Sequence, residues 1–405
     1  MDDGRALQAR FHARLRDIDA DAWNALLPDD NPFLDHAFLS GLEQHGCIGA
    51  RTGWRSHHLG LYDGDRLVAA APLYLKGNSH GEFVFDWSWA SAYAQHGLDY
   101  YPKLLCAVPY SPVSGPRLLV GDGSDAEALR AALVTALRAE AERLDLSSAH
   151  LNFSVDADAA VLDRSDWLAR FDWQFHWHNQ PVEQGGWRDF DAFLAALNHK
   201  KRKNIRQERA RVSRAGVSCE LRHGDELDDV EWLALHAFYL ATFDDKGNYP
   251  ALTLDFFRHL GRTMPRRVVA VLCRRDGALI AGTLMLRSST TLYGRYWGCT
   301  EQVEGLHFEA CYYQGIDYCL REGLTTFEPG AQGEHKLARG FLPTRTRSFH
   351  WIADRRFRAA VADALEREAY HLNGYREDLL EHSPYAQAVA AATVSSPNLP
   401  LDGEG

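Results

Sequence analysis

Several sequence features that define large protein classes are missing from this chain of 405 residues. It has no CxxC, GxGxxG, Walker A, HExxH or protein-kinase motif, which argues against zinc-ribbon, dinucleotide-binding, P-loop and zincin classes. The seven cysteines are odd in number and scattered, so we expect free thiols in a reducing compartment. The longest mainly apolar stretches, residues 67–75 and 268–272, are too short to span a bilayer. The acidic N-terminus has no apolar signal-peptide region, so we expect a soluble cytoplasmic protein without a transmembrane segment, for which peripheral membrane contact stays open.

The composition is typical of a folded, acidic protein. A hydrophobic fraction of 46% is enough for a sizeable core and excludes disorder as the main state. The 44 basic and 55 acidic residues give a formal net charge of −11, which argues against DNA as a partner, although a local basic stripe can still bind phosphate. The length allows two or three domains, and two is the natural expectation.

The first half of the chain predicts helices, then a β-hairpin, then further strands and a helix. The predicted elements are helices within residues 1–45, a hairpin at 58–62 and 67–75, a strand at 82–86, a long ordered loop over 87–117, a helix at 126–144, and strands at 150–154 and 171–178.

The second half predicts a similar but clearer order. Its predicted elements are a helix at 189–197, a basic segment, a strand at 217–223, helices at 228–243 and 254–262, a hairpin at 268–274 and 279–287, a strand at 291–297, a helix at 308–322, and strands at 325–328 and 348–352 before a helix at 356–370. This order resembles that of a GNAT-type acyltransferase domain. We therefore predict an α/β fold of two GNAT-like units in tandem, with two mixed sheets flanked by helices. The expected domains cover residues 1–180 and 181–395, the second with a basic helix at 200–214, followed by a loose tail at 396–405.

The strongest local charge lies in that basic segment, residues 200–214. Eight basic residues and one acid give a net charge of +7 over fifteen positions. Like charges at this density repel one another, and binding a polyanion such as a tRNA, a CoA diphosphate or an anionic headgroup would relieve the repulsion. Lys203 and Arg206 are therefore candidate donor-binding residues. The alternative is a solvated basic helix whose charges pair with acids elsewhere in the fold.

A second candidate is the glycine-bearing turn, which we define as residues 329–341. Its glycines let backbone N–H groups approach a phosphate or an oxyanion, and its two cations supply charge. The carboxylate before the turn, or the imidazole within it, could take a proton from an attacking amine. The alternative is a tight connection whose polar residues only satisfy backbone groups. The candidate residues are Glu328, Gly330, Gly333, His335, Lys336, Arg339, Gly340 and Phe341.

Further candidates lie on other segments. Alternation in the strand at 291–297 places Arg295, a candidate donor-binding residue, on the face opposite to that of Tyr296. Glu309 is a third candidate base, in the helix at 308–322. The stretch at 81–86 and the loop at 100–103 suit either a substrate groove or a rigid connection. The candidate acceptor-binding residues are Asp86, Tyr101, Lys103 and Tyr296. Two His-containing pairs lack further ligands at metal-binding spacing, so we expect no metal.

Seven stretches of the chain together resemble the FemAB-like proteins of bacteria, a family of N-acyltransferases of the GNAT superfamily and of peptidoglycan biosynthesis or recognition proteins. They are residues 81–86, 100–104, 175–179, 200–209, 292–298, 307–313 and 328–341. The resemblance implies the tandem fold of Fem aminoacyltransferases, which move an amino acid from aminoacyl-tRNA to an amine of a peptidoglycan precursor. It also implies that Lys336, Arg339, Gly340 and Phe341 correspond, with shifted spacing, to a Lys–x–Gly–Phe-type segment beside the donor. The usual acetyl-CoA pyrophosphate loop is not found.

These patterns together predict an N-acyltransferase of the EC 2.3 class. It would move an acyl or aminoacyl group from acyl-CoA or aminoacyl-tRNA to the amine of a small molecule or a cell-wall precursor, without a tightly bound cofactor. We expect direct transfer, for which positioning and oxyanion stabilisation supply most of the rate. We also expect the glycine-bearing turn and the basic helix to face one shared cavity. The alternative function is a non-catalytic module of the same fold that binds a peptidoglycan precursor.

Overall fold

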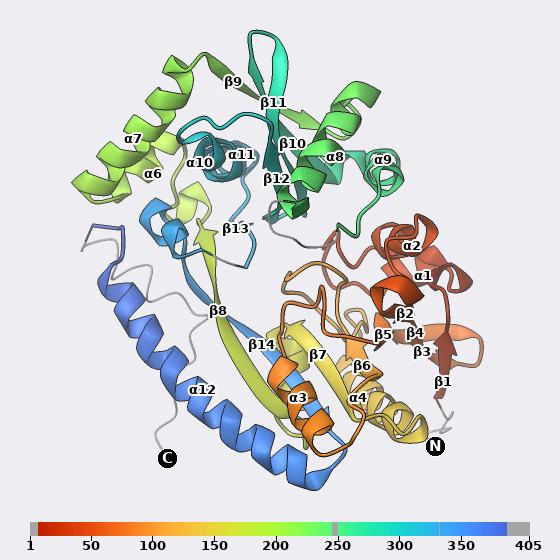
Figure 1. Ribbon diagram of the computed structural model, residues 1–405. Coiled ribbons are helices and arrows are strands. Elements are labelled where there is room, and N and C mark those ends of the chain that lie inside the picture. The colour runs from red at the N-terminus through yellow and green to blue at the C-terminus, as the bar shows by residue number, and fades with distance from the viewer. Residues whose placement is uncertain (1–6, 245–249, 332, 387–405) are drawn as a thin grey trace.

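The computed structural model describes residues 7–244, 250–331 and 333–386, and these form two α/β halves joined by a continuous sheet (Figure 1). Within the described residues, eleven strands follow the order β2-β5-β6-β7-β14-β8-β13-β12-β11-β10-β9, and β1-β3-β4 form a separate small sheet. The predicted mixed α/β fold is therefore confirmed. The two predicted mixed sheets are joined edge to edge, because β8 pairs with strands of both halves.

The first half contains most of the predicted elements and differs from the prediction in three places. Its elements are β1 (Gln8–His12), α1 (Ala20–Asn24), α2 (His36–Gln44), β2 (Trp54–Ser56), β3 (His58–Asp63), β4 (Arg66–Ala71), β5 (Leu73–Lys76), α3 (Trp87–Gln95), β6 (Lys103–Cys106), α4 (Ala126–Arg143), β7 (Ser148–Ser154), α5 (Asp156–Leu162) and β8 (Leu168–His178). The hairpin, the helix at 126–144 and the strands at 150–154 and 171–178 are confirmed.

The differences have identifiable causes. No strand forms at residues 82–86, and the predicted loop at 87–117 contains the helix α3 and the strand β6. Aromatic and glycine content suggested a loop there, but Trp89 and Tyr93 are four residues apart and bury one helical face. At the start of the chain, β1 is a strand because its backbone pairs with β3, which local helix propensity does not reveal.

The second half follows its predicted order closely. Its elements are α6 (Phe190–Ala196), α7 (His199–Arg214), β9 (Val217–His223), α8 (Asp229–Asp244), α9 (Leu254–Thr263), β10 (Val268–Arg275), β11 (Ala278–Arg287), β12 (Thr291–Cys299), α10 (Leu306–Phe308), a π-helical turn (Glu309–Tyr313), α11 (Gln314–Glu322), β13 (Thr326–Glu328), β14 (Leu342–Ile352) and α12 (Arg355–Glu381). The last strand and the last helix are longer than predicted. The predicted tail at 396–405 lies outside the described residues.

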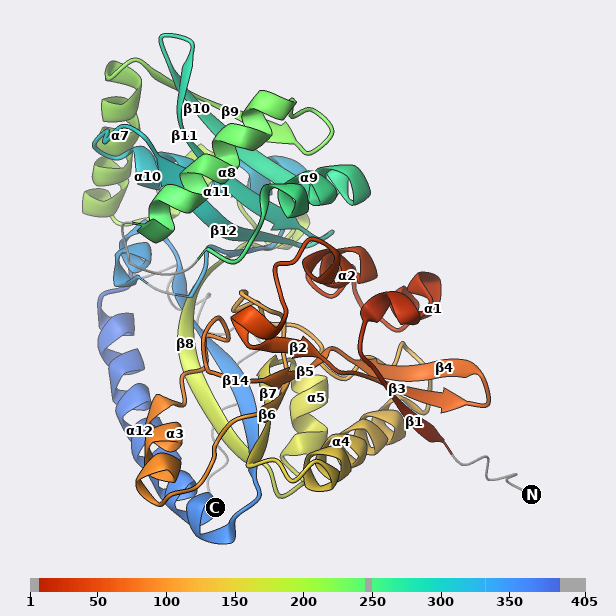
Figure 2. The ribbon, with the colours of Figure 1, turned by 45° about the vertical axis from the view of Figure 1, so that its right-hand side comes forward.

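The long strands β8 and β14 hold the two halves together (Figure 2). β14 comes from the second half but lies between β7 and β8 of the first half, and α12 packs along both long strands. Trp177 of β8 is fully buried against Phe193 of α6. The sheet thus crosses the proposed boundary after residue 180, and the division into two domains stays a prediction.

The separation of β12 from β13 creates the place where a site can form. The two strands are parallel and pair over only three residues, from Thr291 with Thr326 to Tyr293 with Glu328. β12 then continues to Cys299, whereas β13 ends and the chain enters the glycine-bearing turn. The turn therefore lies beside the free edge of β12. None of the helices in the described part of the chain has the length and apolarity that crossing a bilayer requires.

The packing of α8 on β12 gives a test of this architecture. A Cβ atom at Gly298 would lie 2.0 Å from the carbonyl oxygen of Phe238 in α8. We expect Gly298→Ala to lower the free energy of unfolding by about 1–3 kcal/mol, because backbone must move. In the α12 helix, a Cβ at Gly374 would meet no atom within 4 Å, so Gly374→Ala should raise stability by up to about 1 kcal/mol. Urea denaturation of both variants measures the difference, and a wild-type value for Gly298→Ala would contradict this packing.

Candidate active site

A buried group of three charged side chains lies where β12 and β13 separate. Glu328 ends β13, Arg295 lies on β12, and Lys336 lies in the turn. The Glu328 and Arg295 side chains are less than one-tenth exposed, and Lys336 is buried. The Nη2 atom of Arg295 is 3.7 Å from Oε2 of Glu328, and Nζ of Lys336 donates a hydrogen bond of 2.6 Å to the carbonyl of Gly330. The structure thus brings together three residues predicted from separate parts of the sequence.

The first half of the chain completes this group. Nε of Arg295 donates a hydrogen bond of 3.0 Å to Oγ of Ser111, in the loop after β6. From β8, Nε2 of Gln174 donates to the carbonyl of Pro112 at 3.0 Å, and its Oε1 lies 3.2 Å from Nε2 of His176. The charged group is therefore enclosed by side chains and backbone from both halves.

Burial shifts the pKa values of these groups toward neutrality. Burial raises the pKa of Glu328 to about 7, although the Arg295 guanidinium favours its ionised form. Burial, and to a smaller extent the charge of Arg295, lowers the pKa of Lys336 to about 7. Among the described residues, Oε2 of Glu328 and Nη2 of Arg295 have no hydrogen-bond partner. A carboxyl group with this pKa can accept a proton from an amine at neutral pH, and the two cations can stabilise developing negative charge.

The outer part of the turn is organised differently. His335 is exposed, and its Nε2 lies 2.9 Å from the hydroxyl of Tyr312. Partial burial, Arg339 and Lys336 lower the pKa of His335. Arg339 is buried and donates to Glu208 of α7 at 2.7 Å, so its guanidinium links the turn to the basic helix. Gly340 has a φ of +96°, which favours glycine.

The remaining residues of the turn have structural surroundings. Phe341 is fully buried against Phe327 and Tyr312. Gly330 and Gly333 are half-buried, with φ of +97° and +115°. Donor binding by these residues stays a prediction, since their observed contacts are with the protein itself.

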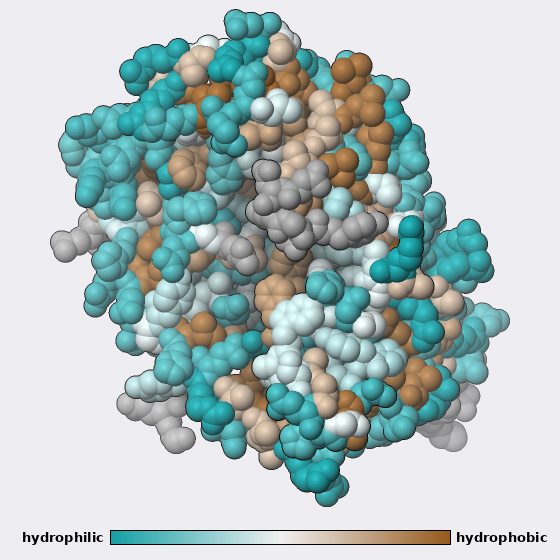
Figure 3. Space-filling model, viewed as in Figure 1, coloured by the Kyte–Doolittle hydropathy of each residue, from teal (hydrophilic) through white to brown (hydrophobic). Residues whose placement is uncertain are grey.

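The basic helix α7 buries one stripe and pairs part of its charge. Ile205 and Val212 are buried, as the spacing predicted. Three arginines pair with acids from other elements, in the pairs Arg206–Asp191, Arg209–Glu309 and Arg211–Glu304. Within the described residues, Lys200, Lys201 and Lys203 form no ion pair, and the surface over α7 is hydrophilic (Figure 3). The pairing of three arginines fits the alternative of a basic helix paired with acids of the fold, and polyanion binding by the segment stays a prediction.

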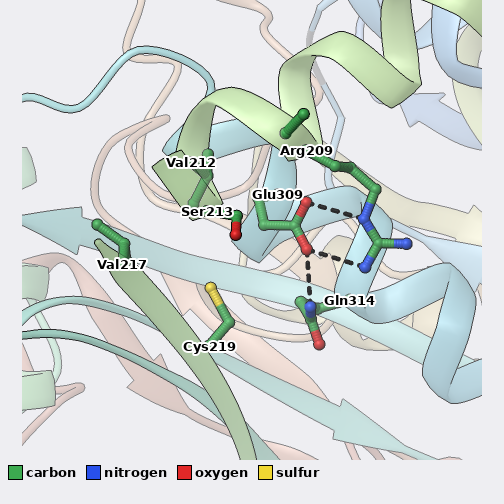
Figure 4. Close-up of a pocket in the computed structure, with 8 residues that line it drawn as sticks. Arg209, Val212, Ser213, Val217, Cys219, Glu309 and Gln314 are labelled. Carbon is green, nitrogen blue, oxygen red and sulfur yellow. Dashed lines mark hydrogen bonds and ion pairs between the residues drawn. The ribbon is translucent and has the colours of Figure 1, made fainter. Parts of the chain in front are cut away.

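Glu309 lies apart from Glu328 and faces another cavity. It begins the π-helical turn, where Nε and Nη2 of Arg209 donate to its two oxygens at 3.1 Å and Gln314 donates at 2.7 Å (Figure 4). The cavity has a volume of about 340 Å³ and is bordered by α7, β9 and this turn. Because cationic and amide donors occupy the Glu309 carboxylate, its surroundings suit charge pairing more than proton transfer.

The four candidate acceptor-binding residues are buried or partly buried in networks of their own. Nζ of Lys103 donates to Glu82 at 2.8 Å and to Asp86 at 2.5 Å, and both carboxylates are buried. Burial opposes ionisation of Asp86, but Lys103 and other partners lower its pKa to about 2. Tyr101 bonds to Ser79 of the same network at 2.6 Å. Tyr296 packs in a separate aromatic group, against Tyr239 and Phe257.

The hydrogen-bond network of Lys103 fixes the segment at 82–86, in which alternate residues point outward. Glu82 and Asp86 are buried, whereas Phe83 and Phe85 are 37% and 49% exposed. A second cavity, of about 120 Å³, is lined by Phe83 and Phe85 together with residues of β8 and β14 and with Ala331 of the turn. The sequence reasoning chose the acids of this segment and missed the phenylalanines. The two phenylalanines between the acids at 82 and 86 were the available signal.

The basic helix and the glycine-bearing turn meet in the Arg339–Glu208 ion pair. The first cavity borders α7 and the second borders the turn, and neither lining combines the two segments among the described residues. The two segments are therefore neighbours that contact each other directly. The prediction that both face one shared cavity is not met by either of these two cavities. Within the described residues, no three His, Cys, Asp or Glu side chains gather as a metal site would require.

Comparison with solved structures places the fold. A crystal structure of FemX aligns with a TM-score of 0.51 and 12% sequence identity, covering 88% of this chain and 100% of that one. The C-terminal domain (DUF2156) of a putative lysylphosphatidylglycerol synthetase from Agrobacterium fabrum aligns with a TM-score of 0.50 and 12% identity, covering 85% and 95%. At this identity the likeness concerns the fold, and the predicted Fem-type tandem fold is confirmed.

The family is shown by the sequence itself. The model of the FemAB-like family, described as peptidoglycan biosynthesis/recognition, matches residues 14–387. The chain belongs to this family, as its motifs predicted. No curated protein matches the chain.

The raised pKa of Glu328 predicts how stability depends on pH. In the folded state Glu328 keeps its proton up to about pH 7, whereas an unfolded glutamate loses its proton near pH 4.5. The protonated form of Glu328 therefore stabilises the folded state fully below pH 4.5. This stabilisation is lost as the pH rises through 7. Glutamine does not ionise, so Glu328→Gln removes this pH-dependent loss of stability. We expect the variant to gain up to about 3 kcal/mol relative to wild type between pH 5 and pH 8.5, measured by urea denaturation. Exposed Glu183→Gln is the control, and equal gains at both pH values would contradict the assigned pKa.

Proposed function

We propose that this protein transfers an aminoacyl group from aminoacyl-tRNA to an amine of a peptidoglycan precursor. The observation that carries the proposal is the buried group of Glu328, Arg295 and Lys336, in which an acid with a pKa near 7 pairs with Arg295 and the turn that follows it carries a lysine with a pKa near 7. Membership of the FemAB-like family supports the peptidoglycan precursor as acceptor. The chemistry of the three residues supports transfer over mere binding, because a buried acid whose pKa is raised to about 7 and whose Oε2 has no hydrogen-bond partner among the described residues is suited to proton transfer.

The proposed reaction is a direct attack of the acceptor amine on the ester carbonyl of the donor. The carboxylate of Glu328 takes a proton from the amine as the new C–N bond forms. Arg295 and Lys336 stabilise the negative charge that develops on the carbonyl oxygen. The C–O bond to the carrier then breaks, and the proton passes to the leaving ribose oxygen. Positioning of the two substrates replaces a covalent intermediate.

The charges around α10 and α7 favour tRNA over acyl-CoA as donor. A helix N-terminus can attract a diphosphate, but the loop before α10 carries two acids, Glu301 and Glu304, and no cation of its own. These acids already pair with Arg275 and Arg211. The free cations lie instead at the start of α7, spread along its surface, which suits a phosphate backbone more than a single diphosphate.

The second cavity is the proposed acceptor entrance. Its exposed phenylalanines offer ring faces to a sugar or a peptide, and Gln174 on its wall contacts His176. Burial lowers the pKa of His176 well below its ordinary value, and Arg295 and Lys336 have smaller effects in the same direction. The charges of Arg295 and Lys336 thus act on His176, which Gln174 links to the wall of this cavity.

The catalytic role of the buried group predicts a specific pattern of loss. We expect Glu328→Gln to lower kcat by about 10²–10⁴-fold and Lys336→Met by about 10²–10³-fold, because each removes a group that acts in the transition state. Transfer of radiolabelled amino acid from charged tRNA to a precursor measures the rate, and the exposed Glu183→Gln variant serves as control.

The rate of wild type should rise with pH up to about 7, as Glu328 ionises, and this rise should vanish in Glu328→Gln. Wild-type protein that binds precursor but transfers no acyl group from tRNA or CoA would establish the non-catalytic module.

The tRNA proposal predicts a salt dependence that α7 controls. Replacing Lys200, Lys201 and Lys203 together by Gln should reduce the slope of log K against log salt by roughly 2–3 units, since each lost phosphate contact removes 0.7–0.9. Filter binding with charged tRNA at 50–200 mM salt measures the slope. The control replaces three exposed arginines on other surfaces, Arg16, Arg51 and Arg355. An equal slope in both triple variants would contradict donor binding by α7.

A further inference from the structure

Two cysteines face each other across the edge of the large sheet. Cys219 of β9 and Cys273 of β10 are direct partners in the antiparallel register, and their Sγ atoms are 3.5 Å apart. Directly opposite residues in such a ladder point to the same face of the sheet. Their Cα spacing, about 4.5–5.5 Å, lies within the range that a disulfide spans. A small rotation of the two side chains is therefore enough to bring the sulfur atoms to bonding distance.

The two thiols differ in access. Cys273 is fully buried, whereas Cys219 is half-buried and lines the 340 Å³ cavity beside Arg209, with its sulfur pointing away from the strand (Figure 4). The contact with Cys219 and burial raise the pKa of Cys273, so the accessible Cys219 is the first to react. All seven cysteines are free thiols in the structure.

We propose that Cys219 and Cys273 form a peroxide-sensitive dithiol that closes to a cross-strand disulfide. The Cys219 thiolate attacks one oxygen of hydrogen peroxide, which gives a sulfenic acid and, after protonation, one water. The thiol of Cys273 then attacks the Cys219 sulfur, the S–S bond forms, and the hydroxyl leaves as a second water. Two thiols lose two electrons and two protons in total, and peroxide is reduced to two waters.

The disulfide would act on the segment that carries the basic helix. β9 is the edge strand of the sheet and follows α7 after only two residues. A covalent bond to β10 would fix this edge strand and hold the C-terminal end of α7 against the sheet. This inference rests on the cysteine geometry alone and does not require the proposed transfer reaction.

Peptide mapping tests the proposal directly, because each cysteine has its own tryptic peptide. Cleavage after Arg214 and Arg222 gives residues 215–222 with Cys219, and cleavage after Arg267 and Arg274 gives residues 268–274 with Cys273. The full chain is treated with hydrogen peroxide, blocked with N-ethylmaleimide in denaturant, and digested without reductant. We expect the two peptides to appear linked, and the thiol titre to fall from seven to five. Amide exchange in residues 217–223 should slow in the oxidised protein.

Matched variants decide between this bond and other oxidation products. Cys219→Ser, at a half-buried position, and Cys273→Ser should each abolish the linked peptide, while the half-buried Cys311→Ser should leave it unchanged. Reduction with dithiothreitol should restore all seven thiols. Recovery of Cys219 as a sulfinic or sulfonic acid, or linked to the peptide 296–321, would overturn the proposal. Equal linkage in urea-unfolded and native protein would also overturn it, because proximity in the fold would then play no part.

Discussion

The antiparallel pairing of β14 with β8 is the constraint on which the rest of the structure depends. β14 comes from the second half of the chain, yet it lies between β7 and β8, and β8 continues through β13 into the other half of the sheet. Because these strands cross from one half to the other, the loop of Ser111 is held against Arg295 of β12. The buried charges of Arg295 and Glu328 therefore lie at a junction that exists only when both halves are folded together.

Two buried charge groups in the molecule differ in how completely they are paired. Around Lys103, the ammonium group bonds to both carboxylates, so the low dielectric of the interior strengthens these contacts. Glu328 and Arg295 are 3.7 Å apart, too far for a hydrogen bond, and each keeps an unsatisfied polar atom among the described residues. An incompletely paired buried charge costs stability. The first group is thus suited to fixing the segment at 79–86, whereas the second leaves one polar atom each of Glu328 and Arg295 without a hydrogen bond among the described residues.

The sequence predicted local features well and long-range ones poorly. The buried stripe of Ile205 and Val212 in α7 and the hairpin of β10 and β11 follow from periodicity and turn residues, which depend on neighbours in the chain. The motif around Glu328 and Lys336 marked a charged site because its residues are close in sequence. The pairing of Glu309 with Arg209, a hundred positions apart, could not be predicted, since no local pattern specifies which charges meet. The prediction of a loop at 87–117 missed α3, because the burial of Trp89 and Tyr93 in the folded protein stabilises this helix and the local helix propensity of the segment does not predict it.

The basic helix α7 and the glycine-bearing turn are in direct contact, although they line different cavities. Arg339 of the turn bonds to Glu208 of α7, and Phe193 of α6, just before α7, packs against Gly340. These two contacts fix the helix and the turn as one unit. Arg206, Arg209 and Arg211 of α7 pair with acids of the fold, whereas Lys200, Lys201 and Lys203 form no ion pair within the described residues. At the end that carries these lysines the positive helix dipole adds to the lysine charges. If a polyanion binds at these lysines as proposed, the Arg339–Glu208 ion pair links the helix that holds it to the glycine-bearing turn, although the two segments border different cavities.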